Sequence, residues 1–523
     1  MSGIAGPHTM AARLSIAALA ALLAGCAGLP PGADFPRKES FRLADPQLTS
    51  LGRQMAGAAL EHDGASGFRI ITSGAEGLLA RIQMIDGAER TLDLQYFIFR
   101  GDASGRLVLD ALRRAALRGV RVRVLVDDGD TVAGDQRVLA LDGRAGVEVR
   151  IFNPFVYRGH ANVLRAIEFM FNARRLNYRM HNKLLVVDDV AALVGGRNIG
   201  DPYFQLDPRA QLADDDMFVA GPVAGELAAT FDMYWNNILA IPAAALATPP
   251  QLAAAPPPGQ EDLSARIAGG EPYAGMVSGR LPLVWARARV ACDSPEKKRV
   301  LMGARSGWLM NPVVLAAVGG ARSELLVVTP YLIPTTEDMQ VLRDLGRRQV
   351  HVGILTNSLE GSPGVFAQSG YLRQRLAILQ AGIDLHEARS LLGDSRGSGQ
   401  TPRMSRHGHY ALHAKLYVFD RQQLLVGSMN FDSRSKRLNT ELGLIIDSPA
   451  LAAETAARYE EMVLPQNAYA LTLQPRHAGG KPQIRWHTEE QGRSIDTFRE
   501  PAQGWWQRWL ARVLSLMPFE SQQ

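Results

Sequence analysis

The sequence is poor in cysteine, in net charge and in long apolar runs. Only two of its 523 residues are cysteine, Cys26 and Cys292, which excludes a disulfide-stapled scaffold and a cysteine-based metal cluster. Lys and Arg together (57) barely outnumber Asp and Glu (52), so the net charge of +5 would suit anionic lipid headgroups or nucleic acid without selecting either. The main apolar run, residues 14–24, is too short to span a bilayer.

Length and apolar content are what the chain does have. A chain of 523 residues is too long for one ordinary domain and long enough for two sizeable cores. Its hydrophobic fraction of 46% and charged fraction of 21% are typical of a globular protein and not of a disordered one. We therefore expect a globular body with more than one domain.

The N-terminus has the pattern of a secretory leader. Arg13 precedes the apolar run, and small residues follow it. The sequence Leu23-Ala24-Gly25-Cys26 resembles a bacterial lipobox, which implies cleavage before Cys26 and lipid attachment to its thiol. This predicts a lipoprotein of the bacterial cell envelope that faces the periplasm, with inner and outer membrane both open. The alternative is a plain signal peptide with a coincidental cysteine. Cys292 is then expected to be a small buried residue.

One long motif occurs twice and organises the rest of the chain. Both copies have a His-x-Lys, four residues, an Asp, six residues, a Gly-Gly or Gly-Ser, any residue and an Asn. Two such motifs with identical order and spacing are not a chance match. The copies are His181-Asn-Lys-Leu-Leu-Val-Val-Asp188 with Gly195-Gly196-Arg-Asn198, and His413-Ala-Lys-Leu-Tyr-Val-Phe-Asp420 with Gly427-Ser428-Met-Asn430.

Each motif predicts a β-hairpin. Apolar runs lie on both sides of Asp188-Asp189 and of Asp420-Arg421, which predicts two strands joined by a tight turn. Residues two apart share a face of a strand, so each His and Lys point together, whereas Asp188 lies about 16 Å from Lys183 and is expected to be structural. If the turn falls between residues 188 and 189, residue 196 returns opposite His181. His, Lys and Asn then meet at one end, where the glycines would allow a ligand close to the backbone.

The flanking segments repeat as well. Residues 91–98, 105–118, 120–126 and 147–152 predict a strand, a helix and two further strands, and residues 324–333, 339–347, 350–356 and 383–387 predict the same order. The offset is 235 residues between Tyr96 and Tyr331, and 232 between the motif histidines. An internal duplication is therefore predicted independently of the motifs.

The paired motifs resemble the HKD signature of the phospholipase D superfamily. Residues 152–155, 179–183 and 430–441 are similar to the cardiolipin synthase C group of bacterial phosphatidyltransferases. The resemblance implies an α/β protein with two duplicated phospholipase D-like domains, mixed sheets and one active site at their interface. The expected organisation is a signal peptide (1–25), a tether and N-terminal helix (26–67), the first domain (68–240), a linker (241–280), the second domain (281–470) and a C-terminal tail with an amphipathic helix (471–523).

The site residues follow from the motifs and the resemblance. His181, Lys183, Asn198, His413, Lys415 and Asn430 are the expected catalytic set. Two histidines facing a phosphodiester suit double displacement through a phosphohistidine, and carry-over makes His181 the nucleophile and His413 the general acid. Two fixed lysines would replace a metal ion, so no metal or cofactor is required. By resemblance Asp214 and Glu441 orient the histidines, with Asp215 or Asp216 open in place of Asp214. The structural positions are Asp188, Asp420, Gly195, Gly196, Gly427 and Ser428.

The expected reaction is phosphatidyl transfer from phosphatidylglycerol or phosphatidylethanolamine to a lipid hydroxyl. A hydrolytic phospholipase D producing phosphatidic acid differs only in its acceptor pocket, and Gln368 stands where the family more often has His. A nuclease is disfavoured, because no basic stripe with interleaved aromatics is evident. A non-catalytic envelope binding protein is the alternative from another class. Membrane phospholipids are the expected partners, and two motifs in one chain remove the need for a dimer.

The C-terminal tail predicts one amphipathic helix. Residues 505–517 place Trp506, Trp509, Leu510, Val513 and Met517 on one face. Such a helix would either lie on a bilayer or pack on the second domain, and packing on the domain is the expectation we adopt.

Overall fold

The computed structural model describes residues 29–129, 138, 141–142, 145–159, 162–207, 209–246, 272–278, 280–304, 307–362, 364–390, 409–475 and 482–516. The proposed signal peptide and Cys26 lie outside these residues, as does most of the predicted linker. No helix among the described residues is both long and apolar enough to cross a membrane.

The first half is built on one mixed sheet with the strand order β9-β4-β3-β2-β5-β6-β8-β1. β2, β3 and β4 are parallel, and the remaining neighbours are antiparallel. The strands are β1 (Ser66–Ile71), β2 (Thr91–Tyr96), β3 (Arg121–Asp127), β4 (Val147–Phe152), β5 (Lys183–Val187), β6 (Ala191–Gly195), β8 (Asp216–Ala220) and β9 (Ala240–Pro242).

The second half repeats this order as β20-β14-β13-β11-β16-β17-β19-β10, again with three parallel strands, β11, β13 and β14. β21 (Gln483–Glu490) and β22 (Arg493–Thr497) extend its outer edge. The repeated strands are β10 (Val284–Cys292), β11 (Glu324–Val328), β13 (His351–Asn357), β14 (Asp384–Ala388), β16 (Leu416–Phe419), β17 (Gln423–Gly427), β19 (Leu442–Asp447) and β20 (Ala468–Gln474). The predicted duplication and fold class are confirmed.

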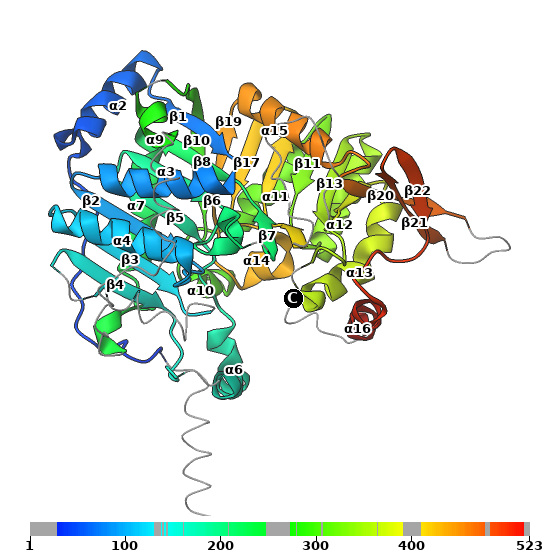
Figure 1. The fold of residues 1–523 in the computed structure, drawn as a ribbon, viewed down its shortest axis with the longest axis horizontal. Helices are drawn as coiled ribbons and strands as arrows, with labels where there is room; N and C mark the ends of the chain where they lie inside the picture. The colour runs from blue at the N-terminus through cyan, green and yellow to red at the C-terminus, as the bar shows by residue number, and fades with distance from the viewer. Residues whose placement is uncertain are drawn as a thin grey trace, which may run out of the picture.

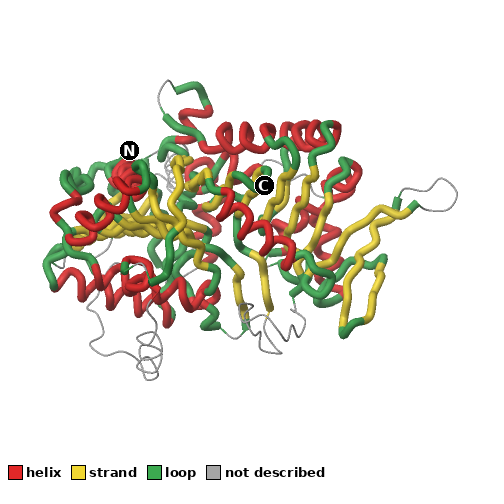
Figure 2. Tube along the Cα trace, turned by 90° about the horizontal axis from the view of Figure 1, so that it is seen from above, coloured by secondary structure: helices red, strands yellow, loops and turns green. Residues whose placement is uncertain are grey.

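A single strand joins the two sheets. The start of β10 pairs with β1, Ala286 opposite Ser66, and the rest pairs with β19, Arg287 opposite Asp447. The two sheets therefore form one continuous layer across the molecule (Figures 1 and 2).

Alternating strand residues feed three hydrophobic cores. Leu185 and Val187 face the outer core of the first half, beneath α3 (Gly74–Gly87) and α4 (Ala103–Leu117). Leu184 and Val186 face a central core that both halves share, with α7 (Pro222–Trp235) and α15 (Pro449–Met462). α11 (Met310–Gly320), α12 (Thr336–Arg347) and α13 (Val365–Gln380) cover the third core. Because both faces of β5 are buried, this strand is apolar after Lys183.

Several details differ from the sequence-based expectations. Val187 pairs with Ala191, so residue 197 and not residue 196 comes back opposite His181. Gln95 and Val328 face equivalent motif residues, Leu184 and Leu416, so the counterpart of Tyr96 is residue 329 and not Tyr331. Matching Tyr96 to Tyr331 therefore aligned the two halves incorrectly, because identity at one position does not fix strand register.

The end of the linker and the tail helix differ in part from the expectations, whereas the expectation for Cys292 is confirmed. The end of the predicted linker forms a short helix, α9 (Pro272–Val277), in which the Tyr273 backbone N–H bonds the Gln83 side chain on α3 at 3.0 Å. The tail helix α16 (Trp505–Ser515) forms and packs against α13 of the second half as predicted, but Trp506 and Trp509 stay exposed. Cys292 is buried as expected, and burial raises the pKa of its thiol to about 12.

Candidate active site

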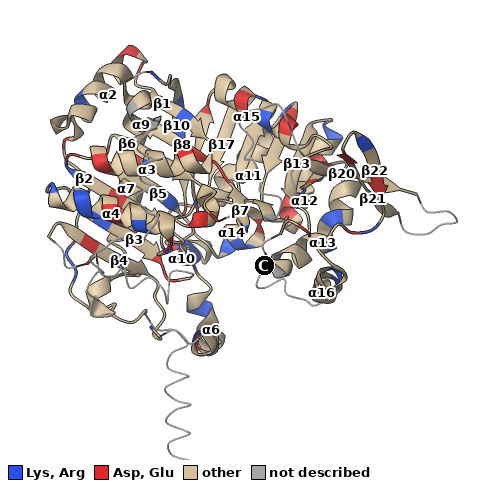
Figure 3. Ribbon diagram, viewed as in Figure 1, with Lys and Arg blue, Asp and Glu red and all other residues tan. Residues whose placement is uncertain are grey.

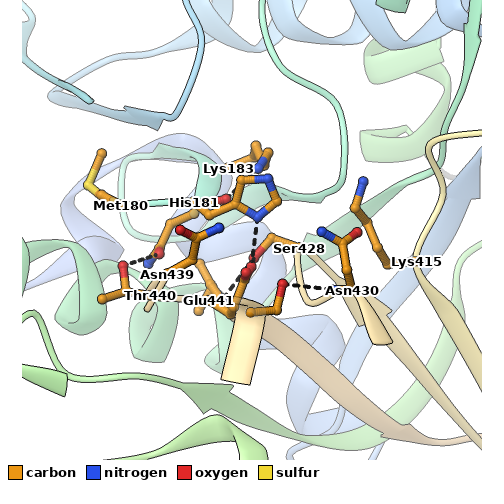
Figure 4. Close-up of polar contacts among 12 residues, drawn as sticks. Met180, His181, Lys183, Lys415, Ser428, Asn430, Asn439, Thr440 and Glu441 are labelled. Carbon is orange, nitrogen blue, oxygen red and sulfur yellow. Dashed lines mark hydrogen bonds and ion pairs between the residues drawn. The ribbon is translucent and has the colours of Figure 1, made fainter. Parts of the chain in front are cut away.

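The two motifs meet between the halves of the molecule. His181 precedes β5 by two residues and Lys183 begins that strand, while Lys415 immediately precedes β16. All six predicted catalytic residues are buried, and together they bring two imidazoles, two ammonium groups and two amides to the interface of the halves. Figure 4 shows His181 and Lys183 from one motif facing Lys415 and Asn430 from the other.

Each histidine is oriented by an acid from the opposite half. His181 Nδ1 lies 2.9 Å from Glu441 Oε2, and His413 Nδ1 lies 2.5 Å from Asp214 Oδ2. A carboxylate at Nδ1 holds the proton there and leaves Nε2 unprotonated, and Lys415 Nζ lies 3.3 Å from this atom of His413. The crossing makes one site that neither half contains alone.

The alternative acids are used elsewhere. Asp216 binds Arg81 at 2.7 Å and Arg197 at 2.9 Å, and Asp215 lies 3.0 Å from Arg458. Asp214 is therefore the orienting acid, located in the break between β7 (Ala210–Ala213) and β8 rather than on a strand.

Backbone hydrogen bonds across the interface place each acid beside the histidine of the opposite half. The N–H of His181 donates to the Thr440 carbonyl at 3.0 Å, directly before Glu441. The N–H of His413 donates to the Ala213 carbonyl at 2.7 Å, directly before Asp214, and β15 (His409–Leu412) runs parallel to β7. Each histidine segment is thus fixed to the segment that carries its acid.

The glycines of the motifs serve packing and not ligand approach. A Cβ at Gly196 would lie 2.2 Å from Asp214 Oδ1, and one at Gly195 would lie 2.3 Å from the Asp215 carbonyl. A Cβ at Gly427 would lie 2.4 Å from the Leu442 carbonyl. Our expectation that these glycines admit a ligand is therefore wrong, because neighbouring protein atoms occupy the space.

Ser428 has a positive role at the position equivalent to Gly196. Its Oγ donates to Glu441 Oε2 at 2.5 Å and accepts the Leu442 N–H at 3.0 Å. It holds the longer carboxylate of Glu441 in place, whereas Asp214 fits directly over the bare glycine.

The motif aspartates close the hairpins. Asp188 has φ 52° and its neighbour Asp189 φ 58°, and Asp420 has φ 52°, so each aspartate adopts the left-handed conformation of a tight turn. The Asp188 carboxylate accepts backbone N–H bonds from residues 89, 90 and 91 at 2.9, 2.7 and 2.8 Å. Asp420 does the same for residues 322–324. The predicted structural role is confirmed.

The two asparagines differ in their contacts. Asn198 Oδ1 accepts the Ile98 N–H at 3.1 Å and its Nδ2 donates to Tyr203 Oη at 2.8 Å, so most of this amide is used within the protein. Asn430 Oδ1 is buried and has no hydrogen-bond partner in the described chain. Asn430 is the better placed of the two to bind a substrate oxygen.

Burial dominates the electrostatics of the site. Burial, followed by the charges of Lys183 and Lys415, holds the pKa of His181 well below its ordinary value. Burial and Lys415 lower the pKa of His413 to about 3. Burial lowers the pKa of Lys415 to about 8 and that of Lys183 well below its usual range. At neutral pH both imidazoles are neutral in the empty site.

The two acids are shifted in opposite directions. Burial by itself would raise the pKa of Asp214, but the charge of Lys415 and the hydrogen bond with His413 outweigh it and hold this pKa below its ordinary value. Burial raises the pKa of Glu441, and Lys183 only partly offsets it. Asp214 is therefore the more firmly ionised acid.

Three further residues support the site without carrying a signal in the sequence. Asp293 Oδ2 accepts the Glu441 N–H at 2.9 Å and a bond from Lys297 Nζ at 2.8 Å. The rings of Phe97 and Tyr203 pack edge-on against His181 and His413 at 5.1 and 5.2 Å. None belongs to a motif, and only the folded interface brings them to the histidines.

This arrangement defines the class of protein. Unprotonated Nε2 atoms on two acid-paired histidines, with two lysines in the same site, suit nucleophilic displacement at a phosphodiester. Across the described residues no group of three His, Cys, Asp or Glu side chains is placed to hold a metal ion. The duplicated mixed sheets and this site are those of the phospholipase D superfamily.

Comparison with known proteins gives the family. The family described as "Cardiolipin synthase, PLD-like domain" matches residues 81–235 and 314–463, and the chain belongs to it. Cardiolipin synthase C of Escherichia coli (strain K12) is 34% identical over 475 residues, which cover 88% of this chain and 97% of that protein. The chain is therefore an enzyme of the phosphatidyltransferase type.

Two further proteins are similar to this chain at lower sequence identity. The major cardiolipin synthase of Bacillus subtilis (strain 168) is 25% identical over 397 residues, 76% of this chain and 68% of that protein. Phosphatidylserine synthase of Haemophilus influenzae Rd KW20 has a similar structure, with a TM-score of 0.50 and 14% identity, covering 80% of this chain and 91% of that one. At that identity the likeness extends to the fold alone.

Proposed function

We propose that the protein transfers a phosphatidyl group from phosphatidylglycerol or phosphatidylethanolamine to the hydroxyl of a second lipid, producing cardiolipin. The crossed histidine–acid pairs are the observation that carries this proposal, because they supply one oriented nucleophile and one oriented acid on opposite sides of a single site. The similarity to a cardiolipin synthase over 88% of the chain supports the lipid substrate.

In the first step His181 Nε2 attacks phosphorus. A P–N bond forms, the P–O bond to the headgroup alcohol breaks, and His413 gives its proton to that alcohol. In the second step His413 takes the proton of the incoming hydroxyl, whose oxygen attacks phosphorus as the P–N bond breaks. Lys183 and Lys415 stabilise the negative charge of both transition states.

The opposite shifts of the acids support this assignment of roles. The more firmly ionised Asp214 is the better partner for an imidazolium, which suits His413 as the general acid. His413 has a pKa of about 3 in the empty site, so it must gain its proton as substrate binds. The negative charge of the phosphodiester favours that protonation.

Hydrolysis to phosphatidic acid remains the alternative. The region that departs from the family pattern lies against the site, since Asn357 holds both the N–H and the carbonyl of Leu412, at 2.8 and 2.9 Å, beside His413. Gln368 Nε2 donates to the Asn357 carbonyl at 3.1 Å and so supports this contact. Gln368 therefore supports the backbone next to His413.

The test is to incubate the purified protein with labelled phosphatidylglycerol, with and without phosphatidylethanolamine, and to separate the lipid products. We expect cardiolipin, absent with His181→Ala. Phosphatidic acid as the sole product would identify a hydrolase, and no product from either lipid would refute a phospholipid substrate. Full activity of His181→Ala would refute catalysis by the paired motifs.

We further propose that the protein is a lipoprotein of the bacterial cell envelope, held at the membrane through Cys26 and facing the periplasm. The lipobox-like sequence supports this location, which places the catalytic body beside its substrate. Metabolic labelling with a radioactive fatty acid should mark the wild type but not Cys26→Ala. Labelling of both would refute the attachment site.

A further inference from the structure

Helix α6 (Asn162–Leu176) exposes an apolar face. Of its 15 residues only Leu176 is buried, although a helix in a globular protein normally buries an apolar stripe. Val163 and Met170 are 70% and 69% exposed, and Ile167 and Phe171 are 40% and 50% exposed. Their spacing places these four side chains on one side of the helix.

Helix α16 exposes a second apolar face. Ala511 is its only buried residue, while Trp505, Trp506 and Trp509 are 69%, 55% and 48% exposed. Large exposed aromatics are costly in water, and tryptophan is the residue that collects at the boundary between lipid and water.

Each helix borders one half of the active site. α6 ends five residues before His181, and Arg434 of the second half holds Asn177 in between, with Nη1 2.6 Å from its Oδ1. On α16, Gln507 Nε2 donates to the Leu359 carbonyl at 2.7 Å, in the loop that follows Asn357. In Figure 1 both helices lie along the lower edge of the molecule and are seen end-on.

Both helices carry a surplus of positive charge. α6 has three arginines against one acid, Glu168. Arg165 donates to the Asp128 carbonyl at 2.8 Å and Arg175 lies 3.5 Å from Glu168, so Arg174 is the exposed cation of this helix. α16 has Arg508 and Arg512 and no acid. Basic segments are visible on both helices in Figure 3. Apolar faces flanked by arginine fit an anionic lipid surface.

We propose that Val163, Ile167, Met170 and Phe171 of α6 and the three tryptophans of α16 form a docking face, which inserts into an anionic phospholipid bilayer on both sides of the active site. The inference rests on the proposed function in one respect, that the bilayer supplies the substrate. Docking by two helices would hold the site at headgroup level, where a scissile phosphodiester lies.

The start of the described chain agrees with this orientation. Arg37 Nη1 bonds the Ile238 carbonyl at 3.1 Å, beside β9, which pairs with β4 at the lower left of Figure 1. Leu29 is three residues after Cys26, so a lipid on that cysteine would attach within about 10 Å of Leu29.

The test compares bilayer and monomeric substrate in the full-length protein. The variants are Ile167→Glu/Phe171→Glu and Trp506→Glu/Trp509→Glu, with Leu60→Glu and Leu117→Glu as controls at exposed apolar positions on other helices. On vesicles of phosphatidylglycerol and phosphatidylcholine we expect the docking-face variants to lose about 10-fold or more in activity. On monomeric dihexanoyl-phosphatidylglycerol they should stay within about 2-fold of wild type, as should the controls on both substrates. Any lipid attached at Cys26 would be common to all variants and controls.

Equal loss on both substrates, or no loss on vesicles, would overturn the proposal. A dimer that the same variants convert to monomers in sedimentation would overturn it in favour of a second copy on this face. A second measurement separates docking from catalysis: brominated lipids in anionic vesicles should quench tryptophan fluorescence in the wild type and less so in Ile167→Glu/Phe171→Glu. A wild type that is quenched but inactive on every lipid would refute the proposed function and leave docking supported. Equal quenching in both proteins would refute docking.

Discussion

Replacing Glu441 by Gln and Asp214 by Asn should inactivate different halves of the reaction. Each change keeps the side-chain volume but removes the negative charge that the histidine Nδ1 contacts, at 2.9 Å for His181 and 2.5 Å for His413. An amide NH₂ facing Nδ1 favours the tautomer with the proton on Nε2, which blocks that nitrogen. From the equivalent change in an Asp–His pair of serine proteases, we expect a loss in kcat of about 10³–10⁴ for each variant.

A phosphatidyl ester of p-nitrophenol separates the two effects. Nitrophenolate departs without a proton, so the first step needs the nucleophile but not the general acid. Asp214→Asn should therefore release about one nitrophenol per enzyme in a fast burst, followed by slow turnover, because His413 is still needed as the base of the second step. Glu441→Gln should show no burst. Stopped-flow absorbance of nitrophenol, with the enzyme at a concentration comparable to that of the substrate, measures both the burst and the slow turnover.

The opposite pattern would refute the assignment. A burst from Glu441→Gln and none from Asp214→Asn would make His413 the nucleophile, and bursts from both would mean that neither acid acts through its histidine. Asp215→Asn is the matched control, because Asp215 lies against Arg458 and not against a histidine. It should keep activity within a few-fold of wild type, and thermal melts of all three variants would exclude unfolding as the cause.

Three further predictions follow from the contacts of the site. The pKa of Lys415 is about 8 in the empty site, so kcat/KM should fall as pH rises through about 8. The fall in kcat should occur at a higher pH, because the phosphate of the bound substrate stabilises the protonated lysine. Values of kcat/KM that stay constant up to pH 10 would contradict this prediction. Asp188→Ala leaves three backbone N–H groups without their acceptor, so the free energy of unfolding measured by urea titration should fall by about 2–4 kcal/mol. The activity per folded molecule should stay normal. A variant that is stable but inactive would instead indicate a catalytic role for Asp188. Asn198→Ala should mainly lower stability and Asn430→Ala should mainly lower kcat/KM. Of these two amide oxygens, that of Asn198 accepts a backbone N–H and that of Asn430 has no partner among the described residues; the reverse ranking would refute this.

Much of the fold was predictable, because strand and helix periodicity is local information. The predicted strand at residues 147–152 is β4 itself, and the predicted helix at 105–118 is α4 within two residues at its start. The predicted hairpins are also present, because residues two apart share a face of a strand and each His and Lys therefore lie together at one end of it. Register was less predictable: a three-residue hairpin connection shifted the return strand by one, and a repeated tyrosine suggested a false equivalence.

The pairing of acids with histidines lay beyond any local pattern. Asp214 and Glu441 occupy equivalent positions in the two halves, so the sequence identifies both without saying which histidine each one serves. The answer depends on how the halves pack, through the contacts of His181 with Thr440 and of His413 with Ala213. Asp293 was missed for the same reason, since it reaches the site only by holding the Glu441 backbone.

In the mechanism we propose, the pairing of each histidine with an acid from the opposite half would let two copies of one motif perform two different tasks. Each histidine has the same neighbours along the chain, so its chemistry is decided by what the other half presents to it. The first half presents Asp214, which fits over a glycine and is kept ionised by the charge of Lys415 and the hydrogen bond with His413. The second presents Glu441, which is longer, fixed by Ser428 and made less acidic by burial. A symmetric site would offer two equivalent histidines, whereas in the mechanism we propose these small differences would let one serve as nucleophile while the other carries the proton.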